Sequence, residues 1–179
     1  MAHRCPPWFC AAFDNPVRRL VHDPVKMLRP YVRERMTVLD VGAGKGYFAI
    51  PMARLVGPAG RVVAADIHPA MLKGIMRRAG KAGLTSRITP RLVAEDASDY
   101  GISADFVLMF WVLHEVPDQD RILAAVRRSL KKGGRLFIAE PRLHVKKPAF
   151  EASVARCAAA GFAVEARPAV ALSLAVVLS

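Results

Sequence analysis

The stretch that decides the fold is Thr37-Val-Leu-Asp-Val-Gly-Ala-Gly-Lys-Gly-Tyr-Phe48. It predicts an apolar strand, Thr37–Val41, that runs into a glycine-rich turn and then into a helix. Glycines at 42, 44 and 46 carry no Cβ, so a ligand can press against the backbone N–H groups of the turn. This pattern indicates a loop that binds a nucleotide-like cofactor.

The glycine spacing excludes two common nucleotide loops. A phosphate-binding P-loop needs a hydroxyl residue after its lysine, but Lys45 is followed by Gly46. The dinucleotide fingerprint needs glycine at position 47, where this chain has Tyr47. The pattern that remains is Asp-x-Gly-x-Gly-x-Gly, from Asp40 to Gly46. An ordinary strand–turn–helix corner, with Asp40 as a helix cap, is the alternative.

The rest of the chain alternates between runs of strand length and stretches with helical spacing. This alternation is typical of an α/β fold, a doubly wound Rossmann-like parallel sheet with helices on both faces. Seven strands are expected, at Thr37–Val41, Arg61–Asp66, Ile88–Val93, Phe106–Phe110, Arg135–Ala139, Ala163–Ala166 and Ala171–Leu178. Helices are expected at Gly46–Val56, Ala70–Ala82, Asp118–Leu130 and Pro148–Ala160.

Length and composition limit the function classes. The 179 residues suit a single domain, and 53% hydrophobic with 23% charged residues exclude a disordered chain. Twenty-seven Lys and Arg against fifteen Asp and Glu give a net charge of +12, which suits an anionic partner. Three cysteines are too few for a disulfide framework, so a cytoplasmic location is expected. No apolar run is long enough for a signal peptide or membrane span.

The basic, aromatic and proline-rich residues 1–35 are predicted to form an arm or lid on a main domain of residues 36–179. Trp8 in this arm is a candidate to cover the site and touch substrate. His3, Cys5 and Cys10 lack a clear fourth ligand, so no metal site is expected there. With Cys157, these cysteines also leave open a thiophilic substrate such as trivalent arsenic.

The loop from Asp40 to Gly46 resembles that of the class I S-adenosylmethionine-dependent methyltransferases. The resemblance implies that Asp40 lies under the methionine end of S-adenosylmethionine, where its carboxylate helps to neutralise the ammonium group. Asp66, at the end of the second strand, would accept both ribose hydroxyls, and Asp96 would reach the adenine amine. A helix cap and a solvated acidic loop are the respective alternatives. The expected cofactor-binding residues are Asp40, Gly42, Ala43, Gly44, Gly46, Asp66, Ile67, Asp96, Ala97 and Phe110.

The segment Asp105–Asp118 resembles the fourth strand and following turn of the branch that includes the ubiquinone and menaquinone biosynthesis methyltransferases. There the end of the strand, here Met109, Phe110 and Trp111, lies near the reacting methyl group. The resemblance covers Thr37 to Pro141. It implies a sheet order of 3-2-1-4-5-7-6, with the last strand antiparallel.

The sulfonium of S-adenosylmethionine already activates its methyl group, so the protein needs only to align a nucleophile, exclude water and remove a proton. His114 is the candidate base because it follows the fourth strand and its ordinary pKa is near 6.5. The alternative is a histidine with a purely structural role. Glu140 and His144 follow the fifth strand, and with Trp8 and Trp111 they are the candidate substrate-binding residues.

The sequence therefore predicts a cytoplasmic methyltransferase that acts on a small molecule and leaves S-adenosylhomocysteine. An RNA methyltransferase is a second hypothesis, because Lys73, Arg77 and Lys81 share one face of a predicted helix. A non-catalytic S-adenosylmethionine-binding subunit is a third hypothesis. Oligomeric state and acceptor identity do not follow from the sequence.

Overall fold

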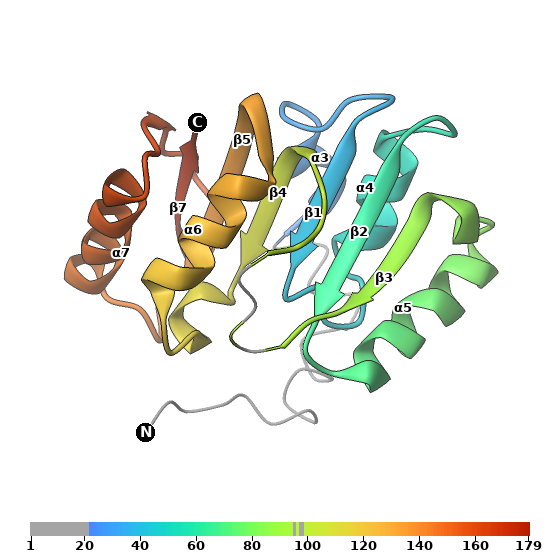
Figure 1. The fold of residues 1–179 in the computed structure, drawn as a ribbon, viewed down its shortest axis with the longest axis horizontal. Coiled ribbons are helices and arrows are strands. Elements are labelled where there is room, and N and C mark those ends of the chain that lie inside the picture. The colour runs from blue at the N-terminus through green and yellow to red at the C-terminus, as the bar shows by residue number, and fades with distance from the viewer. Residues whose placement is uncertain (1–21, 95, 97–98) are drawn as a thin grey trace.

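The computed structural model describes residues 22–94, 96 and 99–179 (Figure 1). Trp8, Ala97, Cys5 and Cys10 lie outside these residues. One seven-stranded sheet runs through the domain in the order β3-β2-β1-β4-β5-β7-β6, which confirms the predicted order. Its strands are β1 Thr37–Val41, β2 Arg61–Asp66, β3 Ile88–Leu92, β4 Ala104–Phe110, β5 Leu130–Pro141, β6 Val164–Ala166 and β7 Ser173–Leu178.

The strands β3, β2, β1, β4 and β5 pair in parallel, and β7 pairs antiparallel with both β5 and β6. The predicted antiparallel last strand is thus confirmed. β1 lies near the middle of the sheet, in register with β2 on one side and β4 on the other. The carboxyl ends of these parallel strands meet at one edge of the sheet, as Figure 1 shows, which is where open α/β sheets bind ligands.

Helices cover both faces of the sheet. α3 Pro24–Leu28, α4 Ala49–Leu55 and α5 Pro69–Lys81 pack on one face, and α6 Gln119–Ser129 and α7 Lys147–Ala159 pack on the other. In Figure 1, α4 lies behind the sheet and α6 in front of it. Successive side chains of each strand point to opposite faces of the sheet, so they contribute to two separate cores. Val38 of β1 packs with the first group of helices, and Leu39 packs with the second.

The helix after β1 begins later than predicted. The sequence predicts a helix from Gly46, but α4 begins at Ala49, because residues 44–48 form successive turns and Gly46 has a φ of +81°. The other three predicted helices agree with α5, α6 and α7 to within one residue at each end, whereas α3 was not predicted. β4 and β5 begin earlier than predicted, at Ala104 and Leu130, and two short 3-10 turns occur at Thr85–Arg87 and Leu113–Glu115.

The described part of the N-terminal arm packs into the core. Leu28 of α3 is fully buried and Val32 almost so, and the ring of Tyr31 stacks 6.1 Å from that of Phe106. Residues 22–35 therefore contribute to the first core of the sheet. A lid role for the preceding residues stays a prediction. In the part of the chain that the structure describes, no helix is both apolar enough and long enough to cross a bilayer.

Cys157 is a buried core residue. Its side chain has no exposed surface, and burial raises the pKa of its thiol to about 12. With Cys5 and Cys10 replaced by serine, we expect a maleimide to label Cys157 only as fast as the protein unfolds, and readily in concentrated urea. Labelling of the native protein at the rate of a free thiol would contradict this placement.

Candidate functional site

Residues from β1, β2, β4 and β5 meet at the carboxyl edge of the sheet. The turn after β1 is tied to β2, because the N–H groups of Gly42 and Ala43 both donate to the carbonyl oxygen of Ala65, at 2.9 and 3.0 Å. Gly42 has a φ of +68°, and a Cβ on it would lie 2.5 Å from Cγ2 of Val112. Glycine is required here both by the backbone and by the segment after β4 that lies against it.

Gly44 differs from the other glycines of the turn. Its φ of +53° also favours glycine, but a Cβ built on it meets no atom of the described residues within 4 Å. By contrast, a Cβ on Gly46 would lie 3.1 Å from Ile75 of α5. Protein packing therefore accounts for glycine at 42 and 46, whereas at 44 the space beside the backbone is open to a ligand.

This contrast makes a prediction for two alanine variants. Gly44→Ala is expected to lower the free energy of unfolding by only about 1–2 kcal/mol, the cost of a left-handed alanine, while weakening binding of S-adenosylhomocysteine. Gly42→Ala is expected to cost more stability, because the new Cβ also collides with Val112. Urea unfolding and calorimetric titration of both variants measure the two effects. Equal losses of stability would contradict the distinction.

Asp66, the last residue of β2, holds the glycine loop. Its Oδ2 accepts a hydrogen bond from the N–H of Gly44 and its Oδ1 accepts one from the N–H of His68, both at 2.8 Å. The side chain is 7% exposed. Each carboxylate oxygen can accept a second hydrogen bond, so Asp66 retains acceptor capacity for a ligand. The bond to His68 N–H does not support the helix-cap alternative, because His68 is itself the N-cap residue of α5 and a cap would accept from the N–H groups that follow it.

Asp40 is a buried carboxyl group without enough partners. It is 2% exposed, and among the described residues its Oδ2 has no hydrogen-bond partner. Burial, and then the negative charge of Asp66, raise the pKa of Asp40 to about 8. Its side chain does not cap α4, whose first turn has no side-chain cap. A buried carboxyl group of this kind suits a cationic ligand.

Aromatic residues gather where β4 ends. The ring of Phe110 lies 4.4 Å from that of Phe48, which follows the glycine loop, and 5.3 Å from that of Trp111. The rings of Phe110 and Trp111 each lie 5.3 Å from that of His22. Phe110 therefore packs at the end of the glycine loop and Trp111 packs against Phe110, while their roles in binding stay predictions.

His114 and Glu140 form a pair between the segment after β4 and the end of β5. Glu140 is 2% exposed; its Oε2 contacts Nδ1 of His114, and its Oε1 accepts a hydrogen bond from the N–H of Leu113 at 2.9 Å. Nε2 of His114 lies 4.0 Å from Glu115. The ring of the exposed His144 lies 6.0 Å from that of His114, so the structure brings all three predicted residues together.

Electrostatics at this pair favour the protonated histidine. Burial by itself lowers the pKa of His114, but the hydrogen bond and negative charge of Glu140 outweigh it and raise the pKa above 6.5. Burial also raises the pKa of the neighbouring Glu115. With Glu140 at Nδ1, the other ring nitrogen is the one that can exchange a proton with a ligand.

Asp96 lies apart from this group. Its side chain is 73% exposed and lies 3.5 Å from Arg121 of α6, so the described contacts fit the solvated-loop alternative as well as the adenine role. Two aliphatic side chains nearby are unusually exposed: Ile67, which follows β2, is 42% exposed, and Leu92, the end of β3, is 58% exposed. Leu92 is in register with Asp66, so the exposed Leu92 side chain lies beside the end of β2.

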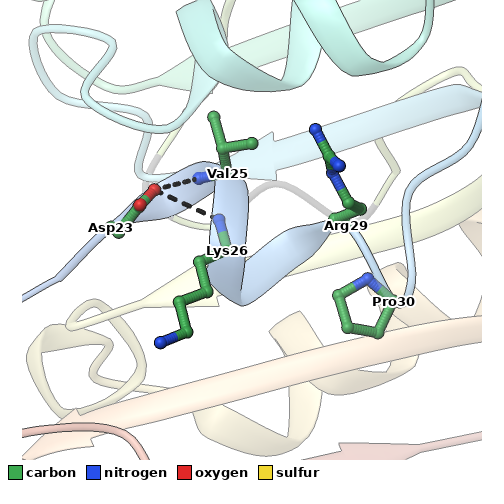
Figure 2. A pocket seen from close by; sticks show the side chains of 5 residues that line it. All are labelled: Asp23, Val25, Lys26, Arg29 and Pro30. Carbon is green, nitrogen blue, oxygen red and sulfur yellow. Dashed lines mark hydrogen bonds between the residues drawn. The ribbon is translucent and has the colours of Figure 1, made fainter.

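The pocket in Figure 2 is a separate feature. It is a depression of about 420 Å³ against α3, lined by Asp23, Val25, Lys26, Arg29 and Pro30. Asp23 accepts hydrogen bonds there from the N–H groups of Val25 and Lys26, which caps α3. None of its lining residues belongs to the glycine loop or to the His114–Glu140 pair. Among residues 22–94, 96 and 99–179, no group of three His, Cys, Asp or Glu side chains could hold a metal ion.

Comparison with known proteins identifies the family. A family model described as a methyltransferase domain matches residues 33–166, which is most of the chain. The chain belongs to the class I S-adenosylmethionine-dependent methyltransferases. Over 110 residues it is 34% identical to the ubiquinone/menaquinone biosynthesis C-methyltransferase UbiE of Pasteurella multocida, covering 61% of this chain and 41% of the relative. The chain therefore spans less than half the length of the curated relatives it matches.

Solved structures of other methyltransferases share the fold. A methyltransferase from Aquifex aeolicus has a TM-score of 0.85 at 24% identity, covering 98% of each chain. The Aeropyrum pernix fibrillarin with natively bound S-adenosyl-L-methionine has a TM-score of 0.65 at 14% identity, covering 91% of this chain and 71% of that one. The predicted methyltransferase family, the predicted fold and the predicted cofactor, S-adenosylmethionine, are confirmed.

The residues of this methyltransferase fit S-adenosylmethionine. The buried Oδ2 of Asp40 has no hydrogen-bond partner in the described part of the chain, and an ammonium group supplies the positive charge and the donors that this oxygen needs. The open space at Gly44 admits a ligand beside the backbone. Leu92 and Ser173 were not predicted from the sequence to be site residues. For Leu92, the only sequence signal is that an apolar residue stands at the end of an edge strand.

Proposed function

We propose that this methyltransferase transfers a methyl group from S-adenosylmethionine to a small-molecule acceptor, and that His114 removes the acceptor's proton. The observation that carries the proposal is the His114–Glu140 pair, located at the same edge of the sheet as the glycine loop and held by a buried carboxylate. The relatives' names support a small-molecule acceptor, because they are C-methyltransferases of ubiquinone and menaquinone biosynthesis.

Each part of the site has a distinct task. Asp40 would hold the ammonium end of the cofactor, the turn at Gly44 would offer it backbone N–H groups, Asp66 would receive the ribose hydroxyls, and the exposed Ile67 and Leu92 would hold the base. When bound, the cofactor supplies an activated methyl group on a sulfonium. Phe110 and Trp111 make the adjoining surface apolar and exclude water from the acceptor.

His114 completes the chemistry. Its Nδ1–H points to Glu140, which leaves Nε2 as the basic nitrogen. Nε2 would take the proton that the acceptor atom loses on receiving the methyl group. His114, whose side chain is 22% exposed, would then return that proton to solvent.

The RNA hypothesis has weaker support. Lys73, Arg77 and Lys81 are exposed on α5, but α5 packs along β2 and β3, whereas His114 and Glu140 lie at β4 and β5. A nucleic acid bound to the basic residues of α5 would therefore lie beside β2 and β3 and not at the candidate base, His114.

The test is methyl transfer from S-adenosylmethionine labelled in its methyl group. The acceptors are 2-naphthol, thiophenol and a short single-stranded RNA, and mass spectrometry identifies the methylated product. We expect label in a small-molecule acceptor with wild-type protein and a large loss of rate with His114→Ala. Label in RNA would replace the small-molecule assignment. Tight binding of S-adenosylhomocysteine without any turnover would favour the non-catalytic subunit.

A further inference from the structure

Ser173 is a buried hydroxyl residue at the start of β7. It is 1% exposed, and its Oγ accepts a hydrogen bond from the indole Nε1–H of Trp111 at 2.9 Å. The same hydroxyl donates to the carbonyl oxygen of Ala171 at 3.2 Å. The Ser173 hydroxyl therefore uses both its donor and its acceptor, and it links the last strand to the segment after β4.

Trp111 has an unusual backbone conformation. Its φ is +60°, in the left-handed region that residues other than glycine rarely adopt. Its N–H donates to the carbonyl oxygen of Ala139 in β5 at 2.8 Å. β5 therefore holds its main chain and β7 holds its side chain. Strained residues that are held in this way are concentrated at functional sites.

The segment of residues 111–114 connects the two parts of the candidate site. On one side, Val112 lies against Gly42 of the cofactor loop. On the other side, His114 contacts Glu140 of β5. Successive side chains of β5 point to opposite faces of the sheet, so Glu140 and Ala139 lie on opposite faces. Ala139 belongs to the first core, and Trp111 packs against that core. Trp111 and His114 therefore flank the end of β4 from the two faces of the sheet.

We propose that Ser173 is a positioning residue, whose hydroxyl fixes the indole of Trp111 as one wall of the acceptor site. This inference rests on the proposed function, because Trp111 touches an acceptor only if methyl transfer takes place at this edge. A flat indole face suits a planar acceptor, so 2-naphthol is the probe.

The experiment uses a Trp8→Phe background, in which Trp111 is the remaining tryptophan of the two in the chain. Ser173→Ala removes the hydroxyl and Ser173→Thr keeps it. Ser129→Ala is the matched control, because Ser129 is equally buried and its Oγ donates to Ala125 within α6, away from the site. Two quantities are measured: the exchange rate of the indole N–H by NMR, and kcat and KM for 2-naphthol.

In Ser173→Ala we expect indole N–H exchange to become roughly 10-fold faster and KM for 2-naphthol to rise roughly 2- to 10-fold, the range for loss of one hydrogen bond. Affinity for S-adenosylhomocysteine should stay within about twofold, because the described hydrogen bonds of the Ser173 hydroxyl are with Trp111 and Ala171. Ser173→Thr should restore both quantities, and Ser129→Ala should change neither.

Two results would overturn the inference: unchanged exchange in Ser173→Ala, or faster exchange with an unchanged KM. If the wild-type protein does not turn over 2-naphthol, the proposed function is contradicted for this acceptor. In that event, the affinity for 2-naphthol in the presence of S-adenosylhomocysteine replaces KM. Equal affinity of Ser173→Ala and its parent would then overturn the positioning role by itself.

Discussion

Asp40→Asn is expected to weaken S-adenosylmethionine binding at least roughly 30-fold, the effect of removing one partner of a buried charge pair. The same change should make the cofactor-free protein more stable at alkaline pH. Function and stability are opposed at this position. Within the residues that the structure describes, one oxygen of the buried carboxyl group has no hydrogen-bond partner, and the negative charge of Asp66 acts on it. Asparagine keeps the shape but removes the charge.

The stability effect depends on pH in a defined direction. The pKa of Asp40 is raised from 3.8 to about 8 in the folded protein. Between these two values the folded state keeps a proton that the unfolded state has lost. The free energy of unfolding of the wild-type protein should therefore decrease as pH rises from about 4 through about 8, and then level off. In Asp40→Asn this contribution to the decrease is absent.

Thermal unfolding at about pH 5 and about pH 9, with calorimetric titration of S-adenosylmethionine, measures both effects. Asp66→Asn is the matched control. An asparagine oxygen can replace only one of the two acceptors used by the N–H groups of Gly44 and His68, so this variant should lose stability as well as affinity. Unchanged cofactor affinity in Asp40→Asn would refute the assigned role of this carboxyl group.

His114→Ala is expected to reduce kcat for a small-molecule acceptor by roughly 10²–10⁴-fold, the usual contribution of a general base. Cofactor affinity should remain close to that of the wild-type protein, because the described contacts of His114 are with Glu140, Glu115 and the ring of His144. A comparable loss of cofactor affinity would indicate a structural histidine instead.

The pH dependence identifies the partner of this base. His114 must be neutral to accept a proton, so the rate should rise with pH through its pKa, which lies above 6.5 because of Glu140. Glu140→Gln removes the negative charge, so the acid limb of kcat/KM should move to lower pH while the maximum rate falls. His144→Gln is a neighbouring control that should leave the limb nearly in place. An unmoved limb in Glu140→Gln would exclude the pair as the titrating unit.

Much of the fold could be predicted from local patterns. Strand runs such as Arg61–Asp66 and glycines such as Gly42 carry strong local signals, and the structure has the sheet order that the family resemblance implied. The start of α4 could not be predicted, because it depends on how the turn after Gly46 packs against Ile75. α3 was missed because it has only five residues, too few for a helical repeat, and only Pro24 and Leu28 are buried.

The candidate site was predicted in outline but not in its pairings. His114 and Glu140 each follow a strand, and that position alone indicated the functional edge. Their contact joins residues 26 positions apart, and the hydrogen bond from Trp111 to Ser173 joins residues 62 positions apart. Such pairings depend on how neighbouring strands align, which no local pattern reports. From the sequence, Glu140 was predicted to contact substrate, whereas its described contacts are with Leu113 and His114.

Asp66 fastens the glycine loop to the second strand through hydrogen bonds within the protein itself. The conformational entropy of this loop is therefore lost when the chain folds and not when a ligand arrives. A preorganised loop of this kind makes association fast and nearly free of rearrangement. It follows that differences in residence time between ligands will arise mainly from the groups that they place against Asp40 and the aromatic residues.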